Sequence, residues 1–135
     1  MPLYNRGKGQ NQDFTAGTWR WMLLTSAYVP NVDSDFVSDI VANEASGAGY
    51  ARQNVTGQAV SIDDALDRVD HNANNPTFGP MTSAFQYLVL YRFGTVDADS
   101  ALHSYYDLGA QSVTTASYIP LLNGGATSGT VYRGT

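Results

Sequence analysis

The decapeptide AFQYLVLYRF, residues 84–93, decides the fold class of this chain. Every second side chain in it is aromatic or β-branched, which is the period-two pattern of a β-strand. One predicted face carries Phe85, Tyr87, Val89, Tyr91 and Phe93, and the other carries Leu88 and Leu90. Because both faces are apolar, we expect a central strand that is covered on both sides.

Shorter segments on either side also have strand character. The pattern predicts strands at residues 19–24, 51–62, 101–106 and 113–122, and a last edge strand at residues 130–132. Residues 107–109 predict a turn, and we expect a turn at residues 63–64 followed by a strand through Arg68. Residues 35–40 fit either one helical turn or a short edge strand, whereas Gly47 and Gly49 predict a loop with positive φ or close backbone approach. Such a chain is all-β, a small antiparallel β-sandwich or barrel of about seven short strands.

The length of 135 residues is typical of one compact domain. We expect residues 14–135 to form this β domain and residues 1–13, which are polar and glycine-containing, to form a flexible N-terminal arm. Such an arm would add little to the core. The side chains predicted to form much of the core are Trp19, Trp21, Leu23, Tyr87, Val89 and Tyr91.

The charge balance narrows the classes of partner. The formal net charge is −5, and charged residues make up only 14% of the chain, against about a quarter in an average domain. Without a basic cluster, we expect no nucleic-acid partner. No apolar run is long enough for a membrane span, and the N-terminus lacks the apolar centre of a signal peptide. A polar, aromatic and weakly charged surface suits packing against other proteins.

The acidic residues are the first candidates for chemistry. Residues 33–44 resemble a calcium loop only loosely, because Val37 and Ser38 occupy positions that need an oxygen ligand and a glycine. An irregular calcium site stays open beside the alternative that these aspartates cap turns and the loop folds without metal. A second acidic group has Asp63, Asp64, Asp67 and Asp70. We expect it to be a solvated surface rather than the carboxylate pair of a glycosidase.

Nucleophilic catalysis is the second candidate. The chain has no cysteine, and His71 and His103 are its two histidines. No G-x-S-x-G motif occurs, and alternation along a strand would turn Ser104 away from His103. We therefore expect no catalytic residue, no cofactor-binding residue and no resident metal, and a protein that is not an enzyme.

An ordered series of motifs resembles a known family. The series has Trp19-x-Trp21, Tyr28-x-Pro30, Asp35-Phe36-Val37-x-Asp39, Glu44-x-Ser46-Gly47-x-Gly49-Tyr50-x-Arg52, Asn75-Pro76-Thr77-Phe78-Gly79, Tyr87-x-Val89-Leu90-Tyr91-Arg92 and Tyr106-Asp107-Leu108-Gly109. In this order, over residues 17–110, it is similar to small structural proteins from the virion modules of tailed bacteriophages. The resemblance implies a head-decoration, minor capsid or tail-associated role and offers no catalytic residues. It also implies localisation in the virion, assembled in the host cytoplasm, with the major capsid protein or other virion proteins as partners and many copies or a homo-oligomer on the particle.

Exposed tyrosines and the few cations are the candidate contacts with partners. Tyrosine is common at protein interfaces and in sugar-binding sites, and cations on an acidic chain can pair with a neighbour. The predicted partner-binding residues are Tyr4, Arg6, Lys8, Tyr105, Tyr106 and Tyr132. A receptor- or carbohydrate-binding β module of the virion is the alternative function.

Overall fold

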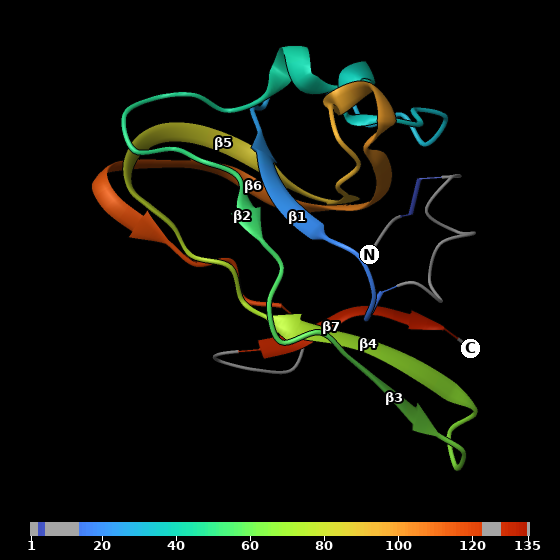
Figure 1. Cartoon of the computed structure of the whole chain (residues 1–135). Coiled ribbons are helices and arrows are strands. Elements are labelled where there is room, and N and C mark those ends of the chain that lie inside the picture. Colours follow the sequence, from blue (N-terminus) through green and yellow to red (C-terminus); the bar gives the residue numbers. More distant parts are fainter. Residues whose placement is uncertain (1–2, 5–13, 123–127, 135) are drawn as a thin grey trace.

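The computed structural model describes residues 3–4, 14–122 and 128–134, and its strands form two antiparallel sheets (Figure 1). One sheet has the order β2-β1-β5-β6 and the other β3-β4-β7. The strands are β1 (Trp19–Leu24), β2 (Gln53–Asn54), β3 (Ala59–Asp63), β4 (Arg68–Asn74), β5 (Phe78–Arg92), β6 (Ala101–Tyr118) and β7 (Ser128–Gly134). The chain is all-β, consistent with a small β-sandwich whose sheets are not closed into a barrel. None of the helical turns in the described ranges is long or apolar enough to span a bilayer.

The predicted central strand lies inside β5, between β1 and β6. Both of its faces are buried from Tyr87 to Tyr91, as expected. Phe85, however, packs with Leu88 and Leu90 rather than with Tyr87, so its predicted face is wrong. The pairing with β6 shifts register between Phe85 and Tyr87, and this β-bulge reverses the alternation of side chains at that point.

The turn predicted at residues 107–109 is a bulge instead. Strand β6 continues through it to Tyr118, so the two predicted strands at 101–106 and 113–122 are one strand. Gly109 has a positive φ of 70°, and its N–H donates to the Asp107 carboxylate at 2.9 Å. The local Asp-x-Gly hydrogen bond of a turn is present. The chain nevertheless stays in the sheet, because β6 pairs with the long strand β5 on both sides of this bulge.

Two hydrophobic cores lie on the two faces of the four-stranded sheet. The inner core packs against the other sheet and includes Trp19, Trp21, Leu23, Phe85, Leu88, Leu90, Ala73 and Val131. The outer core is closed by loops and includes Met22, Leu24, Tyr87, Val89, Tyr91, Tyr28, Val37 and Ile40. All six side chains predicted for the core are buried, and Trp19, Trp21 and Leu23 share a face as predicted.

The segment predicted as one strand at residues 51–62 is divided between the sheets. β2 pairs with β1, whereas β3 pairs with β4. Gly57 turns the chain between them with a φ of 65°, and a Cβ there would lie 2.6 Å from the Asn74 side chain. The glycine therefore permits the crossing, which period-two alternation across 51–62 does not reveal.

The acidic segment forms the β3–β4 hairpin. Its turn covers residues 64–67, longer than predicted, with Asp67 at a φ of 50°. The strand that follows runs to Asn74 and pairs on its other side with β7, which contains the predicted edge strand at 130–132. In Figure 1 this hairpin extends away from the four-stranded sheet at one end of the molecule.

Two residues of the predicted arm are docked on the domain. Leu3 forms an isolated bridge with Ser104, and the Tyr4 N–H donates to the His103 carbonyl at 3.0 Å. Tyr4 is fully buried in the outer core, so the expectation that residues 1–13 add little to the core is wrong at this position. Arg6 and Lys8 lie outside the described residues.

Candidate interaction surfaces

The loop of residues 32–50 is folded tightly onto the domain. Two 3-10 helices, η3 (Val37–Asp39) and η4 (Val41–Asn43), turn Val37 and Ile40 into the outer core. The undecided segment 35–40 is therefore a helical turn. The predicted close approach is confirmed at the glycines, because a Cβ on Gly47 would lie 1.9 Å from the Thr82 carbonyl oxygen and one on Gly49 2.1 Å from that of Pro80.

The carboxylates of this loop do not converge on one point. The Asp39 carboxylate accepts the N–H groups of Phe36 and Asp35 at 3.0 Å each, and these bonds hold the pKa of Asp39 below its ordinary value. Glu44 turns away from the loop toward Arg52. Within the described ranges, no three or more acidic or histidine side chains gather as metal ligands. The geometry of Asp39 fits the turn-capping alternative.

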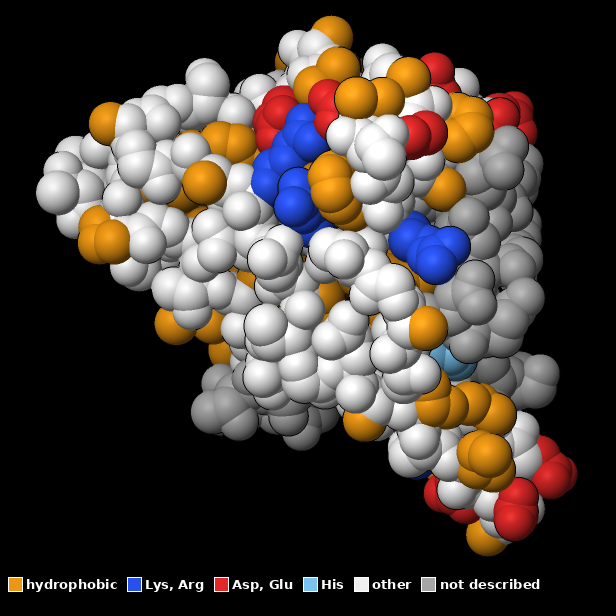
Figure 2. Space-filling view, viewed as in Figure 1, with side chains coloured by type: hydrophobic (Ala, Val, Ile, Leu, Met, Phe, Trp, Pro, Cys, Tyr) orange, Lys and Arg blue, Asp and Glu red, His pale blue; other side chains and the backbone are white. Residues whose placement is uncertain are grey.

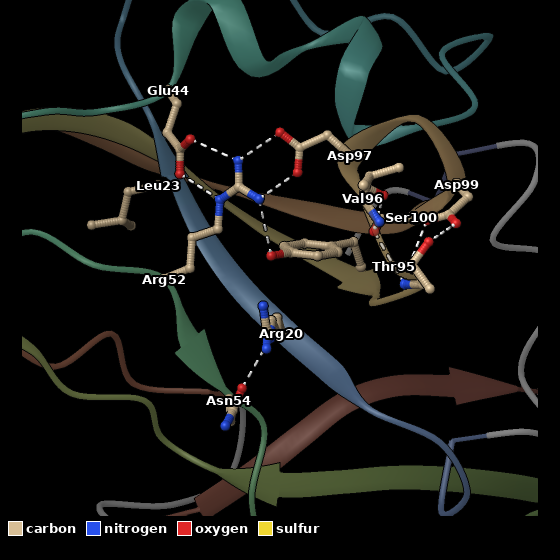
Figure 3. A network of polar contacts seen from close by, with 12 residues as sticks. Arg20, Leu23, Glu44, Arg52, Asn54, Thr95, Val96, Asp97, Asp99 and Ser100 are labelled. Carbon is tan, nitrogen blue, oxygen red and sulfur yellow. Dashed lines mark hydrogen bonds and ion pairs between the residues drawn. The ribbon is translucent and has the colours of Figure 1, made fainter.

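Arg52 joins two loops that are distant in sequence (Figure 3). Its Nε and Nη2 donate to the two Glu44 oxygens at 2.7 and 2.8 Å. Its Nη1 and Nη2 donate to the two Asp97 oxygens at 2.7 and 3.3 Å, and Nη1 also contacts the Tyr91 hydroxyl at 3.4 Å. Because Asp97 begins η5 (Asp97–Asp99), this clamp ties the loop of residues 44–52 to the β5–β6 connection. We call these residues, Arg52, Glu44 and Asp97, the arginine clamp.

The clamp keeps its cation charged and fully bonded. Bonding to Glu44 and to Asp97 raises the pKa of Arg52, so the guanidinium stays charged. The Tyr50 hydroxyl donates to Glu44 at 2.8 Å and accepts the Leu23 N–H at 3.1 Å, and burial raises the pKa of Tyr50. The sequence predicts that residues 46–49 bring backbone amides near the Glu44 carboxylate, but its hydrogen bonds in the structure come from the Tyr50 and Arg52 side chains. The sequence feature that could have indicated the clamp is the scarcity of charge, because Glu44 is the lone glutamate.

The second acidic group belongs to the β3–β4 hairpin. Asp63 accepts the Leu66 N–H at 3.2 Å within the turn. Arg68 lies 3.9 Å from the Asp63 carboxylate and 3.7 Å from that of Asp70, so the group is partly neutralised by one cation. Long, partly exposed ion pairs of this kind are weak. The Asp63 carboxylate therefore stabilises the hairpin turn through a hydrogen bond to its backbone.

Both histidines are buried between the sheets. The His103 Nδ1 and the Ser104 hydroxyl lie 2.8 Å apart, so the two side chains meet despite the expected alternation. His103 packs edge-on against Trp19, and His71 against Phe14. Burial, with a further effect of His71, lowers the pKa of His103 to about 4. Since His103 and Ser104 are both closed to solvent, no substrate reaches the pair in this conformation.

The four tyrosines predicted to bind partners lie in different surroundings. Tyr4 is a core residue whose hydroxyl lies 2.8 Å from that of Tyr28, so its side chain is not presented to a partner. Tyr106 packs against the inner core and reaches the Val131 carbonyl at 3.3 Å. Tyr105 is half-buried at the edge of the outer core, against Tyr4 and Tyr87. Tyr132 belongs to β7, but its side chain lies outside the described residues.

Exposed apolar side chains identify surfaces that the sequence-based interpretation did not single out. Apart from Val96 in the β5–β6 connection, they form three groups, the β3–β4 hairpin with Val60, Ile62 and Leu66, the loop with Val29 and Val32, and the segment after β6 with Ile119 and Leu121. Figure 2 shows apolar side chains beside acidic ones on the projecting hairpin. Single exposed apolar residues are ordinary, but groups on projecting segments are typical of contacts with other proteins.

Comparison of this chain with family models, with curated proteins and with solved structures gave no match.

Proposed function

We propose that this chain is a non-enzymatic virion structural protein of a tailed bacteriophage, a capsid decoration or minor capsid protein that binds the assembled head. The observation that carries the proposal is the grouping of exposed apolar side chains on three separate segments of a domain that otherwise buries its apolar residues in two cores. A protein on a lattice touches several neighbours and therefore needs several contact surfaces. The ordered motifs over residues 17–110 support the same role.

The distribution of polar chemistry agrees with this proposal. The arginine clamp, the Asp39 cap and the buried histidines each have structural partners. The exposed surface that remains includes apolar groups beside acidic and neutral polar side chains, which suit a protein neighbour such as the major capsid protein. A chain of this size has little area for each contact, so firm attachment would come from many copies held on one lattice.

Co-sedimentation with phage heads tests the proposal. Heads of the phage that encodes this chain, assembled with its gene deleted, are mixed with the purified protein and pelleted. We expect saturable binding of many copies per head, weakened by Leu121→Lys and Val29→Lys, which are exposed and leave both cores intact. Thr114→Lys is the control, because this side chain is exposed but polar. Binding of only a few copies would move the protein to the tail, and absence of binding to heads would refute a capsid role.

The surface around Tyr105 favours one alternative, a receptor- or carbohydrate-binding module of the virion. Tyr105 is half-buried on the outer-core face, and nearby Gln86 donates to the Asp107 carboxylate at 3.1 Å. An aromatic ring close to hydrogen-bonding side chains is the arrangement that sugars recognise. Binding to a glycan array that is lost in Tyr105→Ala would support this alternative, and flat binding by the parent protein would exclude it.

A further inference from the structure

In the part of the chain that the structure describes, strand β3 is an edge strand without the features that usually protect such an edge. It is the outermost strand of its sheet and pairs, within the described ranges, with β4 only. Natural edge strands avoid pairing with other chains by means of lysine, proline, bulges or a covering segment. Residues 58–62, QAVSI, contain no charge and no proline, and the β3–β4 register runs from Ala59 to Asp63 without a shift.

The side chains of β3 are also open to solvent on both faces. Four of its five residues are exposed, and Val60 and Ile62, which share one face, are 43% and 71% exposed. Burying such side chains stabilises an association by about 25 cal/mol for each Å² removed from water. Strand β3 therefore offers unpaired backbone groups and an apolar stripe together.

Strand β6, an edge of the four-stranded sheet, shows the contrast within the same molecule. Near its start, Leu3 forms a bridge with Ser104 and the Tyr4 N–H donates to the His103 carbonyl. Its second half is irregular, with several register shifts against β5 and positive φ values at Gly109 and Thr115. Bulges of this kind bend an edge away from straight pairing. Among the described residues, β6 thus has features that hinder edge pairing, whereas β3 is straight and lacks them.

We infer that β3 pairs antiparallel with β3 of a second copy of this chain, centred on Ser61. In this register Val60 lies opposite Ile62 of the second copy, Ser61 lies opposite Ser61, and Ala59 lies opposite Asp63. The apolar side chains meet on one face, and no two charges are directly opposed. The two three-stranded sheets then join into one continuous sheet related by a two-fold axis.

Charge favours the antiparallel orientation of the pair, and the self-complementarity of the strand favours a second copy as the partner. A parallel pair would place the acidic turns, with Asp63, Asp64 and Asp67, side by side. In the antiparallel pair the two Asp63 residues are separated by roughly 13 Å along the strands. That exceeds the screening length of about 8 Å at physiological ionic strength, so repulsion between the turns is small. The strand is self-complementary about Ser61, which a two-fold interface requires.

The contact is small. Pairing of one five-residue strand on each side buries less than the roughly 1,000 Å² of a stable independent interface. We therefore expect weak, concentration-dependent association in solution that becomes effective where copies are held side by side. The inference concerns contact between copies and does not rest on the identity of the surface to which they attach.

A disulfide trap tests the pairing directly. The chain has no cysteine, so Ser61→Cys introduces a single thiol. Directly opposed residues of an antiparallel pair have Cβ atoms about 4.5–5.5 Å apart, close enough for a disulfide after small adjustment. Under mild copper–phenanthroline oxidation in air, Ser61→Cys should yield about tenfold more covalent dimer than Ser117→Cys, which corresponds to about 1.4 kcal/mol of preference. Ser117 is also exposed and lies on the protected edge strand β6.

Second-site variants exclude random collision as the cause. In the Ser61→Cys background, Ile62→Lys should reduce the dimer to the level of Ser117→Cys, whereas Val29→Lys on a distant loop should leave it unchanged. Circular dichroism establishes that each variant is folded. Equal dimer yields for Ser61→Cys and Ser117→Cys, or a yield unaffected by Ile62→Lys, would overturn the inference. Because the assay uses the purified protein alone, its failure leaves head binding untouched, and failure of head binding leaves this result standing.

Discussion

Removal of the Tyr4 side chain should undock the N-terminus and lower the stability of the domain. Tyr4 is fully buried in the outer core, with its hydroxyl 2.8 Å from that of Tyr28 and its ring 5.5 Å from that of Tyr105. A tyrosine side chain buries about 200 Å², and at about 25 cal/mol per Å² this burial stabilises the folded state by about 5 kcal/mol. The main-chain bond to His103 and the hydroxyl pair add about 1 kcal/mol each.

The cost of ordering the terminus reduces this gain. Fixing the backbone of Leu3 and Tyr4 costs about 1–2 kcal/mol per residue, and fixing their side chains costs about 1 kcal/mol more. The net free energy of docking is therefore about 2–4 kcal/mol. If Tyr4→Ala removes the buried ring, the segment of Leu3 and residue 4 can detach from β6, so the loss is limited to about this docking energy.

This limit gives a sharp test. Tyr4→Ala and deletion of residues 1–4 should destabilise the protein equally, by about 2–4 kcal/mol in urea denaturation. Tyr4→Phe should lose about 1 kcal/mol, because it keeps the ring and removes only the contact with Tyr28. A deletion variant that unfolds within 0.5 kcal/mol of the parent, about the error of the method, would show that the docked terminus contributes nothing.

Three further predictions follow from the buried polar groups and the glycines. Arg52→Ala leaves Glu44 without its cation and should destabilise the protein by about 1–3 kcal/mol; Arg20→Ala, at an exposed bond to Asn54, should cost less than about 1 kcal/mol, and equal losses would contradict the importance of the clamp. The folded-state pKa of His103, about 4, lies below the ordinary value of 6.5, so the unfolded chain binds more protons between these values. Stability should thus be constant above the unfolded pKa and fall as the pH drops from 6.5 toward 4, by about 3 kcal/mol. Thermal melts should show a smaller fall for His103→Asn, and a parallel profile would refute the assignment. Gly47→Ala should destabilise strongly, because its Cβ would meet the Thr82 carbonyl oxygen. Gly109→Ala, with a positive φ but open space, should cost only about 1 kcal/mol in the same melts, and equal effects would show that close approach does not matter.

Local pattern predicted the strands better than their connections. Period-two alternation located β1, the second half of β5 and the core side chains that they bury. It assigned Phe85 to the wrong face and ended β6 at residue 106, because a bulge depends on which residues of the partner strand are paired. The glycines 47 and 49 were correctly expected to be sites of close approach, whereas the partner backbone of β5 was not predictable.

The candidate sites show the same division. The scarcity of charge was visible in the sequence, and it directed the interpretation toward contacts between proteins. The arginine clamp was missed, since Arg52 and Asp97 are brought together by the packing of two loops. Tyr4 was predicted to lie at a partner surface because a short polar terminus has no periodic pattern to indicate burial. The site that buries Tyr4 is formed by β6 and Tyr28, which come together only in the folded chain.

The sequence by itself determined that this is an all-β chain with a central, doubly covered strand, because side-chain alternation is a local property of the backbone. Only the tertiary structure decided how the strands divide into two sheets and which edges are left open. Sheet order depends on pairing between residues far apart in the chain, and edge protection depends on what else lies against a strand. For that reason QAVSI is an ordinary strand segment in the sequence, and in the fold it is the unprotected edge of β3.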